Sequence, residues 1–350
     1  MPKRVGGLTE QVLTEENCIK AVLIGTQKLK KTRYIRHIRK YADRYGKLIY
    51  FILKTGWVPK PTRTKIINEG TKRKVRVLTI PTQIDHLIHV AIMLPLIPIL
   101  LKHYDYYSCG SIPEKGQKFA NKVMKQWTSG GDYPYEFAAE CDVQKFYPSC
   151  VSSEVMNCIT RLVKDKPYLS WQNQILNQMG GVIAIGFTPS HWYGNLVLTK
   201  VDNALRQFCS KVKFVRYMDN YVLFAHTKEE LHHAIIILKN TLEKMQLHLK
   251  NDWQIFSTSI RAPQLLSYRY FQNAVLLRKP TMYSISRHLK TAGHKLKAHF
   301  ASGAISRNGL LKYCNSLNYK IKWVYPFINI YQQRRLVSDA AKKCLLCNAA

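Results

Sequence analysis

The sequence predicts an α+β fold, because its helical and strand-like segments do not follow the regular strand–helix alternation of a parallel sheet protein. Apolar residues recur with helical spacing over residues 15–53 and again over 228–245. Short segments with a period of two come in pairs, which favours antiparallel hairpins. One hairpin is centred on residues 218–220, and the other joins 265–270 to 274–277.

The predicted elements are justified in chain order by their periodicity and by the residues that bound them. The first helical segment ends before Gly56 and Pro59, and Pro81 separates a strand over 73–80 from a helix that starts near Asp85. The remaining predictions are a buried helix within 87–101, a buried strand at 137–142, a helix at 152–163, the hairpin of 215–225, an amphipathic helix at 228–245, the hairpin of 265–277 and a basic helical segment after residue 284.

The charge of the chain points to a polyanionic partner. Lys and Arg number 54 against 21 acids, a net charge of +33. Residues 18–68 hold 14 Lys and Arg with one acid, and residues 253–350 hold 16 with one acid. Basic flanks interleaved with Tyr, Trp and His suit a groove that follows phosphates and stacks bases, whereas a charge run is more often a solvated face. We therefore expect a nucleic-acid partner.

Membrane association is not expected, because the sequence has no apolar run of 18 residues and no signal peptide. The nine cysteines lack paired spacing, which favours buried, reduced thiols in a cytoplasmic protein. Cys344 and Cys347 form a single C-x-x-C near the C-terminus, and without a second pair they are a weak zinc or redox signal.

Two acids interrupt apolar segments where a carboxylate is costly without compensation. Asp142 lies in ECDVQKFYPS, and Asp219 lies in RYMDNYVLF. Two unrelated turn acids would explain them singly. If the two strands lie side by side, the acids share divalent cations, because Mg²⁺ binds through one or two carboxylates together with substrate phosphates. The pair is thus a candidate two-metal site for phosphoryl transfer.

The two acidic motifs belong to a longer series of blocks. RYMDNYVLF resembles the Y-x-D-D hairpin of reverse transcriptases, and DVQKFYPS resembles their first catalytic motif. IAIGFTPSHWYGNLVLTKVD between them is similar to the second motif of bacterial members, including Ser190, Asn195 and Asp202. Four other stretches match further blocks in the same order: KVRVLTIPTQIDHLIHVAI, SCGSIPEKG, LHLKNDW and LLSYRY. The chain resembles the reverse transcriptases of diversity-generating retroelements and of bacterial antiphage defence.

The resemblance implies a right-hand polymerase fold with an antiparallel palm sheet. We expect a basic helical extension over 1–70, fingers over 71–136, a palm with the catalytic site and primer grip over 137–280, and a basic helical thumb over 281–350. It also implies two Mg²⁺ ions held by Asp142, Asp219 and the carbonyl of Val143. The remaining implied site residues are the following: Lys74 and Arg76 on the triphosphate, Tyr147 as a gate against the 2′-hydroxyl with Phe146 packed behind it, Gly186 and His191 at the nucleotide, Lys250 as proton donor to pyrophosphate, and Tyr268 at the primer end.

Several positions depart from the family pattern, among them Pro189, where Thr is usual, and the unusual Phe187, Trp192 and Gly194. Asn220 stands where a second Asp is usual, His191 where Gln is usual in the diversity-generating group, and Ser267 where the primer grip has Gly. Asn suits a hairpin turn by itself and offers one oxygen without charge. Because the first acid of the pair is the main ligand in the family, we expect activity to survive.

The expected function is RNA-directed DNA synthesis with a dedicated, structured non-coding RNA, in antiviral defence. Its implied partners are that RNA, the primer and cDNA strand, and dNTPs; an accessory protein or a second copy of the chain stays open. The alternatives are mutagenic copying in a diversity-generating retroelement, template-independent DNA synthesis, and a non-catalytic RNA-binding remnant. Retention of Asp142, Tyr147 and Asp219 together argues against the remnant.

Overall fold

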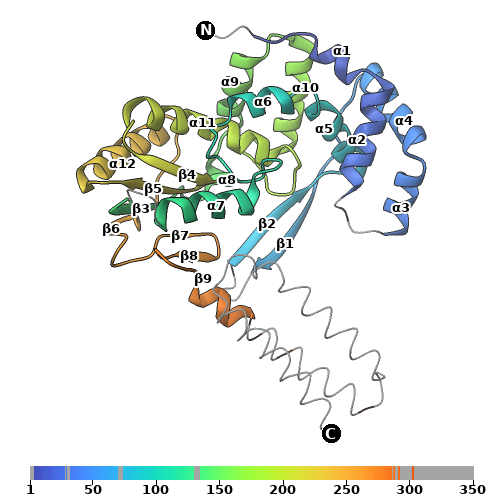
Figure 1. Ribbon diagram of the computed structural model, residues 1–350. Helices are drawn as coiled ribbons and strands as arrows, with labels where there is room; N and C mark the ends of the chain where they lie inside the picture. Colours follow the sequence, from blue (N-terminus) through green and yellow to red (C-terminus); the bar gives the residue numbers. More distant parts are fainter. Residues whose placement is uncertain are drawn as a thin grey trace.

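The computed structural model describes residues 4–27, 29, 32–69, 74–129, 135–285, 287, 291 and 302. Helices and strands are mixed along the chain, as predicted, and the strands form three separate antiparallel sheets (Figure 1). Most of residues 281–350 lie outside the described part, as do Cys344 and Cys347, so the helical thumb stays a prediction. The proposed domain boundaries also stay predictions.

A four-stranded sheet in the order β4-β5-β3-β6 carries the two acidic motifs. Its strands are β3 (Phe137–Asp142), β4 (Lys213–Tyr217), β5 (Asn220–Ala225) and β6 (Gln254–Ser257). Tyr221 and Leu223 face one side of the sheet and belong to the main core, together with buried residues of α11 (Ser190–Phe208) and α12 (Lys228–Glu243). Side chains alternate between faces along a strand, so Val222 and Phe224 point to the opposite side.

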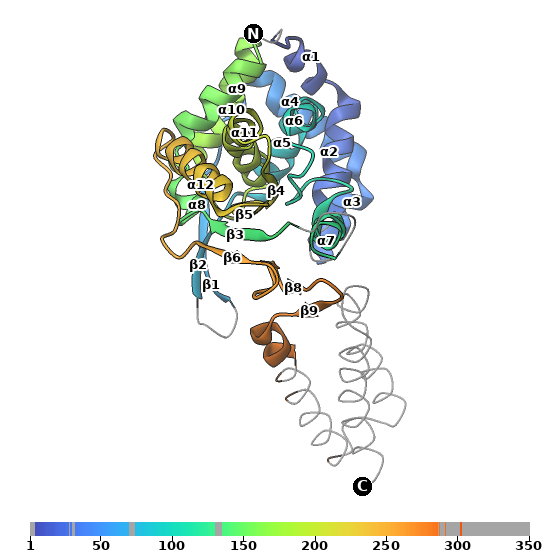
Figure 2. The ribbon, with the colours of Figure 1, turned by 60° about the vertical axis from the view of Figure 1, so that its left-hand side comes forward.

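The opposite face of this sheet is covered by α7 (Gly116–Thr128) and a three-stranded sheet, which lies below the main sheet in Figure 2. The strands of the small sheet are β7 (Gln264–Leu265), β8 (Tyr268–Tyr270) and β9 (Val275–Leu277). Here the prediction of one strand over 265–270 is wrong. Leu265 pairs with Tyr268 across a turn in which Leu266 has a positive φ of 56°, so this segment is itself a hairpin.

Helices dominate the N-terminal part, as predicted, but the segment 15–53 divides into three. The first four helices are α1 (Leu8–Val12), α2 (Glu15–Gln27), α3 (Arg33–Lys40) and α4 (Ala42–Thr55). Gly56 ends α4 in the left-handed conformation with φ 106°, which confirms the predicted stop. The hairpin of β1 (Arg63–Glu69) and β2 (Lys74–Ile80) then extends away from the helices (Figure 1).

The apolar stretch 87–101 was expected to be one buried helix and is two. α5 (Gln83–Met93) and α6 (Ile97–His103) are bent by 57° relative to each other. Pro95 lies at the break, where it has no backbone N–H to donate to an intrahelical hydrogen bond. Among the described residues, only this bent pair taken together has the length and composition of a membrane span, and no single helix does.

Three further helices follow the first acidic motif. They are α8 (Phe146–Ser149), α9 (Ser152–Leu162) and α10 (Lys166–Gln178). The motif stretch 183–202 carries no helix prediction from its sequence pattern, yet most of it lies in the 19-residue helix α11. This helix is buried along most of its length, so its apolar residues do not show the one-sided periodicity of a surface helix.

Candidate active site

The two acids of the sequence motifs lie next to each other at one end of the four-stranded sheet. β3 ends at Asp142, which stands directly opposite Asn220 in the antiparallel pairing with β5. Asp219 occupies the turn just before Asn220, and its carbonyl accepts a hydrogen bond from the Val143 N–H at 3.1 Å. Directly opposed residues of antiparallel strands are about 4.5–5.5 Å apart at Cα. The structure therefore brings Asp142 and Asp219 together as the sequence predicts.

Lys250 joins this pair from a distant part of the chain. Its backbone N–H donates to the Asp142 carbonyl at 2.9 Å, and the Gln144 N–H donates to the His248 carbonyl at 2.8 Å. The Lys250 ammonium forms an ion pair with Oδ2 of Asp142. The predicted proton donor thus touches a predicted metal ligand, because residues 248–250 run antiparallel beside residues 142–144.

The donor set around Asp142 fits a magnesium site that substrate completes. Oδ1 of Asp142 is buried and accepts no hydrogen bond from any described residue, which suits an oxygen reserved for a cation. The third expected ligand is the backbone carbonyl of Val143. The two backbone hydrogen bonds between residues 142–144 and 248–250 do not involve this carbonyl. The described residues contain no group of three or more His, Cys, Asp and Glu side chains that would hold a metal alone. Two carboxylates suit Mg²⁺, which also takes water and phosphate oxygens.

Tyr147 lies on α8, within electrostatic reach of Asp219. Burial and the nearby negative charge of Asp219 raise the pKa of its phenol to about 12, so the hydroxyl is neutral at physiological pH. Phe146 is buried behind it, with the two ring centroids 5.5 Å apart in an edge-to-face arrangement. From the sequence, Phe146 is expected in the core and Tyr147 at the site. The burial of Phe146 agrees with this expectation, and the role of Tyr147 as a gate stays a prediction.

β2 borders the site on another side. The positive charge of Arg76 acts on the Tyr147 phenol and lowers its pKa, opposing Asp219, so Arg76 lies within electrostatic reach of Tyr147. Lys74 opens the same strand, in register with Glu69. Gly186 has φ 118°, and a Cβ there would lie 2.4 Å from the carbonyl oxygen of Thr79. The close approach that requires glycine is therefore to the backbone of β2, where the sequence predicted an approach to the nucleotide.

Comparison with known proteins decides the family. The reverse transcriptase (RNA-dependent DNA polymerase) family matches residues 58–262, more than half of the chain. The chain belongs to the reverse transcriptase family. The description of this family agrees with the expected enzyme class, and the matched segment includes both acids, Tyr147 and Lys250.

A solved structure supports the same fold. The reverse transcriptase chain is similar to the structure of telomerase from Candida albicans in complex with a TWJ fragment of telomeric RNA, with 11% sequence identity and a TM-score of 0.51. The similarity covers 90% of this chain and 63% of the telomerase chain, so this chain spans less than two thirds of that relative's length. No curated protein matches the chain. Family and neighbour together imply the right-hand polymerase fold.

Two residues of the predicted reverse transcriptase site have surroundings that the sequence did not indicate. Tyr268 is 0% exposed in the core between β8 and the central sheet, so its side chain does not contact a primer directly. It supports the predicted primer grip only by packing the small sheet. His191 lies half-buried in the first turn of α11, with its ring centroid 4.9 Å from that of Trp192.

Sequence reasoning missed Arg216, the fully buried cation behind the catalytic turn. The structure surrounds it with Ser108, Asn195 and Asp202, which the sequence indicated only as motif positions without a role. The signal available in the sequence was a lone arginine inside the apolar strand KFVRY, where an unpaired charge is costly.

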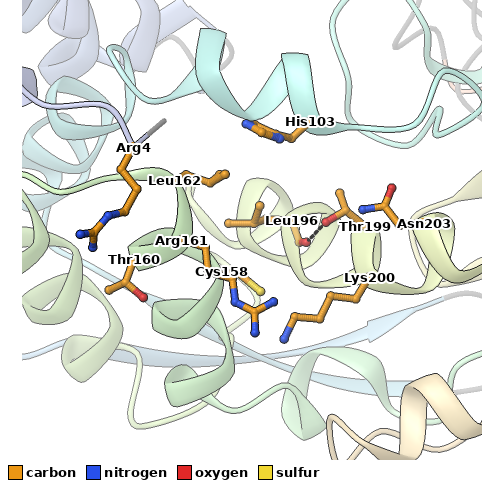
Figure 3. A pocket seen from close by; sticks show the side chains of 10 residues that line it. All are labelled: Arg4, His103, Cys158, Thr160, Arg161, Leu162, Leu196, Thr199, Lys200 and Asn203. Atoms are coloured by element: carbon orange, nitrogen blue, oxygen red, sulfur yellow. Dashed lines mark hydrogen bonds between the residues drawn. The ribbon is translucent and has the colours of Figure 1, made fainter. Parts of the chain in front are cut away.

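A cavity of about 700 Å³ lies between α6, α9 and α11 (Figure 3). Its lining includes the cationic side chains Arg4, Arg161 and Lys200 and none of the predicted site residues. Because none of the predicted site residues line it, this cavity is not the candidate active site. The six described cysteines are buried free thiols, which agrees with the reduced state expected from their spacing.

Proposed function

We propose that the chain is a Mg²⁺-dependent reverse transcriptase that synthesises cDNA on a dedicated structured RNA. The observation that carries this proposal is the side-by-side placement of Asp142 and Asp219, with a buried carboxylate oxygen of Asp142 that accepts no hydrogen bond within the described part of the chain. Bound Mg²⁺ would supply charge neutralisation at the triphosphate and at the attacking primer hydroxyl. The two aspartates would hold it, with the Val143 carbonyl as backbone ligand.

The other site residues receive roles from their positions around the carboxylates. Tyr147 lies beside Asp219 and would exclude the 2′-hydroxyl of a ribonucleotide. Arg76 would bind the phosphates of the incoming dNTP from β2. Lys250 would protonate the leaving pyrophosphate, since its ammonium already lies against a metal ligand.

Primer extension with the native RNA tests the activity. Asp219→Ala should reduce Mg²⁺-dependent dNTP incorporation by about 100-fold or more, because it removes a metal ligand. Asp43→Ala removes an exposed acid of α4 and should leave incorporation unchanged. Equal incorporation by wild type and Asp219→Ala would refute the polymerase proposal.

We place this activity in bacterial antiviral defence, in the cytoplasm, with a non-coding RNA as template or scaffold. Asn220 and the unusual His191 support this setting over diversity generation. Cells that carry the enzyme and its RNA should resist phage infection, and Asp219→Ala should abolish the resistance. Full resistance with the Asp219→Ala variant would separate any protection from DNA synthesis.

The alternative is mutagenic copying by a diversity-generating retroelement, which the resemblance of residues 183–202 to that group favours. Sequencing the cDNA distinguishes the two settings. A defence enzyme should copy its RNA without substitutions concentrated at one template base. Substitutions confined to template adenines would favour the diversity-generating setting.

A further inference from the structure

The turn that carries Asp219 contains a residue in an unfavourable backbone conformation. Tyr217 pairs with Asn220, so Met218 and Asp219 form a two-residue hairpin turn. Met218 has φ 55°, in the left-handed region, which is unfavourable for a residue with a side chain. Such a conformation persists only where surrounding contacts determine it. The contacts that hold Met218 therefore also determine where the next residue, Asp219, lies.

Met218 is held on three sides. Its carbonyl oxygen accepts a hydrogen bond from Nη1 of Arg216 at 3.1 Å. Its sulfur lies 3.7 Å from the donating Nδ2 of Asn195. Its backbone nitrogen lies against Gly110, where a Cβ would come within 2.5 Å and force the turn away. These contacts come from three separate segments, so the strained turn is fixed by tertiary structure.

Arg216 uses every N–H group of its guanidinium. Nε donates to Asp202 Oδ1 at 2.9 Å, and Nη2 donates to Asp202 Oδ2 at 2.6 Å and to Ser108 Oγ at 2.7 Å. Nη1 donates to Asn195 Oδ1 at 2.8 Å and to the Met218 carbonyl. Arg216 is 0% exposed and Asp202 is 1% exposed. The guanidinium cannot rotate without leaving a buried N–H donor unsatisfied, so Arg216 is a rigid support for the Met218 carbonyl.

We propose that Arg216 is a positioning residue for the metal site: it fixes the Met218 carbonyl and thereby the orientation in which Asp219 meets a divalent cation. From the other side, the Val143 N–H holds the Asp219 carbonyl at 3.1 Å. Asp219 is thus fixed between β3 and the Arg216 group. The inference rests on the proposed function and adds to it a residue that controls metal affinity without touching metal or nucleotide.

Arg216→Lys is the informative substitution. A lysine keeps the positive charge near Asp202 but lacks the planar fork that reaches Asn195 and Met218 together. Arg206→Lys is the matched control. Arg206 lies on α11, the same helix as Asp202, and forms a similar two-point contact with Asp105, at 2.7 and 3.0 Å. It does not contact the turn of Met218 and Asp219. Ser108→Ala is the second control, since it removes a bond to Nη2 and leaves Nη1 on Met218.

The readout is the affinity for Mn²⁺, measured by electron paramagnetic resonance of the free ion. The complex contains primer, template and a dNTP whose α–β bridge cannot be cleaved, so no turnover is needed. Arg216→Lys should weaken Mn²⁺ binding by about 10- to 100-fold, the usual effect of removing an outer support of a ligand. It should also raise the Mg²⁺ concentration for half-maximal incorporation, with an unchanged KM for primer–template.

A purely structural role for Arg216 predicts a different pattern. All three variants would then lose thermal stability, and Mn²⁺ affinity would not distinguish Arg216→Lys from the controls, which overturns the inference. If Arg216→Lys does not fold, Asn195→Ala replaces it, because that variant retains the Arg216–Asp202 ion pair but removes the acceptor that orients Nη1 toward the Met218 carbonyl and the Nδ2 contact with the Met218 sulfur. Unchanged Mn²⁺ affinity in Asn195→Ala would then overturn the inference. Failure of wild type to incorporate dNTP is a separate result, since it refutes the proposed function itself.

Discussion

The ammonium of Lys250 forms an ion pair with Oδ2 of Asp142, the acid that ends β3. The Lys250 side chain is 38% exposed and the Asp142 side chain 28%, so solvent screens the pair and it contributes little to stability. Its consequence is chemical. In the proposed reaction Lys250 would compete with a metal ion for one carboxylate oxygen, and it would lie near the charge that develops on leaving pyrophosphate.

Replacing Lys250 should separate these two effects. Lys250→Ala should lower the Mg²⁺ concentration for half-maximal activity, because it removes a competing cation, and lower kcat by about 100-fold, because it removes a proton donor. Lys250→Arg keeps the charge but does not release a proton at accessible pH, so its kcat should be equally low. Single-turnover rates against pH measure both. Wild-type kcat in Lys250→Arg would exclude the proton-donor role, and the exposed Lys244→Ala is the control.

Asn220→Asp tests the departure from the family pattern. Nδ2 of Asn220 donates to Oδ1 of Asp219 at 3.3 Å, so the substitution exchanges a donor for a like charge beside Asp219 and opposite Asp142. Repulsion should lower the melting temperature in metal-free buffer, and Mg²⁺ should reverse the loss. Incorporation at saturating Mg²⁺ should equal or exceed wild type. Loss of incorporation with the fold intact would show a specific requirement for the amide.

Tyr147→Ala should relax the choice of sugar. Removing the ring beside Asp219 opens the space expected for a 2′-hydroxyl, and steric exclusion of one small group is worth about tenfold or more. The ratio of kcat/KM for rNTP to that for dNTP should rise by that factor in primer extension. Tyr147→Phe, which keeps the ring and removes only the neutral hydroxyl, should retain the wild-type ratio. An unchanged ratio in Tyr147→Ala would place the gate elsewhere.

His89 predicts acid sensitivity of the fold. Its side chain is 0% exposed between Trp57 and Phe187, and burial lowers its pKa from 6.5 to about 3. Between pH 6.5 and about pH 3, the His89 side chain binds a proton in the unfolded chain but not in the folded chain. The contribution of neutral His89 to the free energy of unfolding is therefore present above pH 6.5 and is lost as pH falls. One such group costs about 2 kcal/mol between pH 7 and pH 5.

Urea unfolding at the two pH values measures this effect. His89→Phe should lose less stability than wild type on acidification, by about the same 2 kcal/mol, because phenylalanine does not titrate and preserves the ring contacts. An identical pH dependence in the two proteins would show that His89 is not held neutral in the folded state.

Local pattern was enough to predict the strand over 137–142, the hairpin around Asp219 and the helix over 152–163, because periodicity and turn residues act within a few positions. The adjacency of Asp142 and Asp219 was a hypothesis that required the two strands to lie side by side, and the pairing of β3 with β5 confirms it. The predicted elements were wrong where a single residue interrupts a continuous apolar segment. Pro95 lies between α5 and α6, and Leu266 lies between β7 and β8.

The sequence by itself determined the order of the motifs, the basic character of the chain and the residue types proposed to bind metal and nucleotide. Only the tertiary structure decided that Lys250 meets Asp142 across 108 residues, that Gly186 lies against Thr79, and that Tyr268 is buried. It also decided that Arg216 supports the catalytic turn. These relationships join segments far apart in the chain, and their cause is burial and pairing of polar groups, which short-range periodicity does not encode.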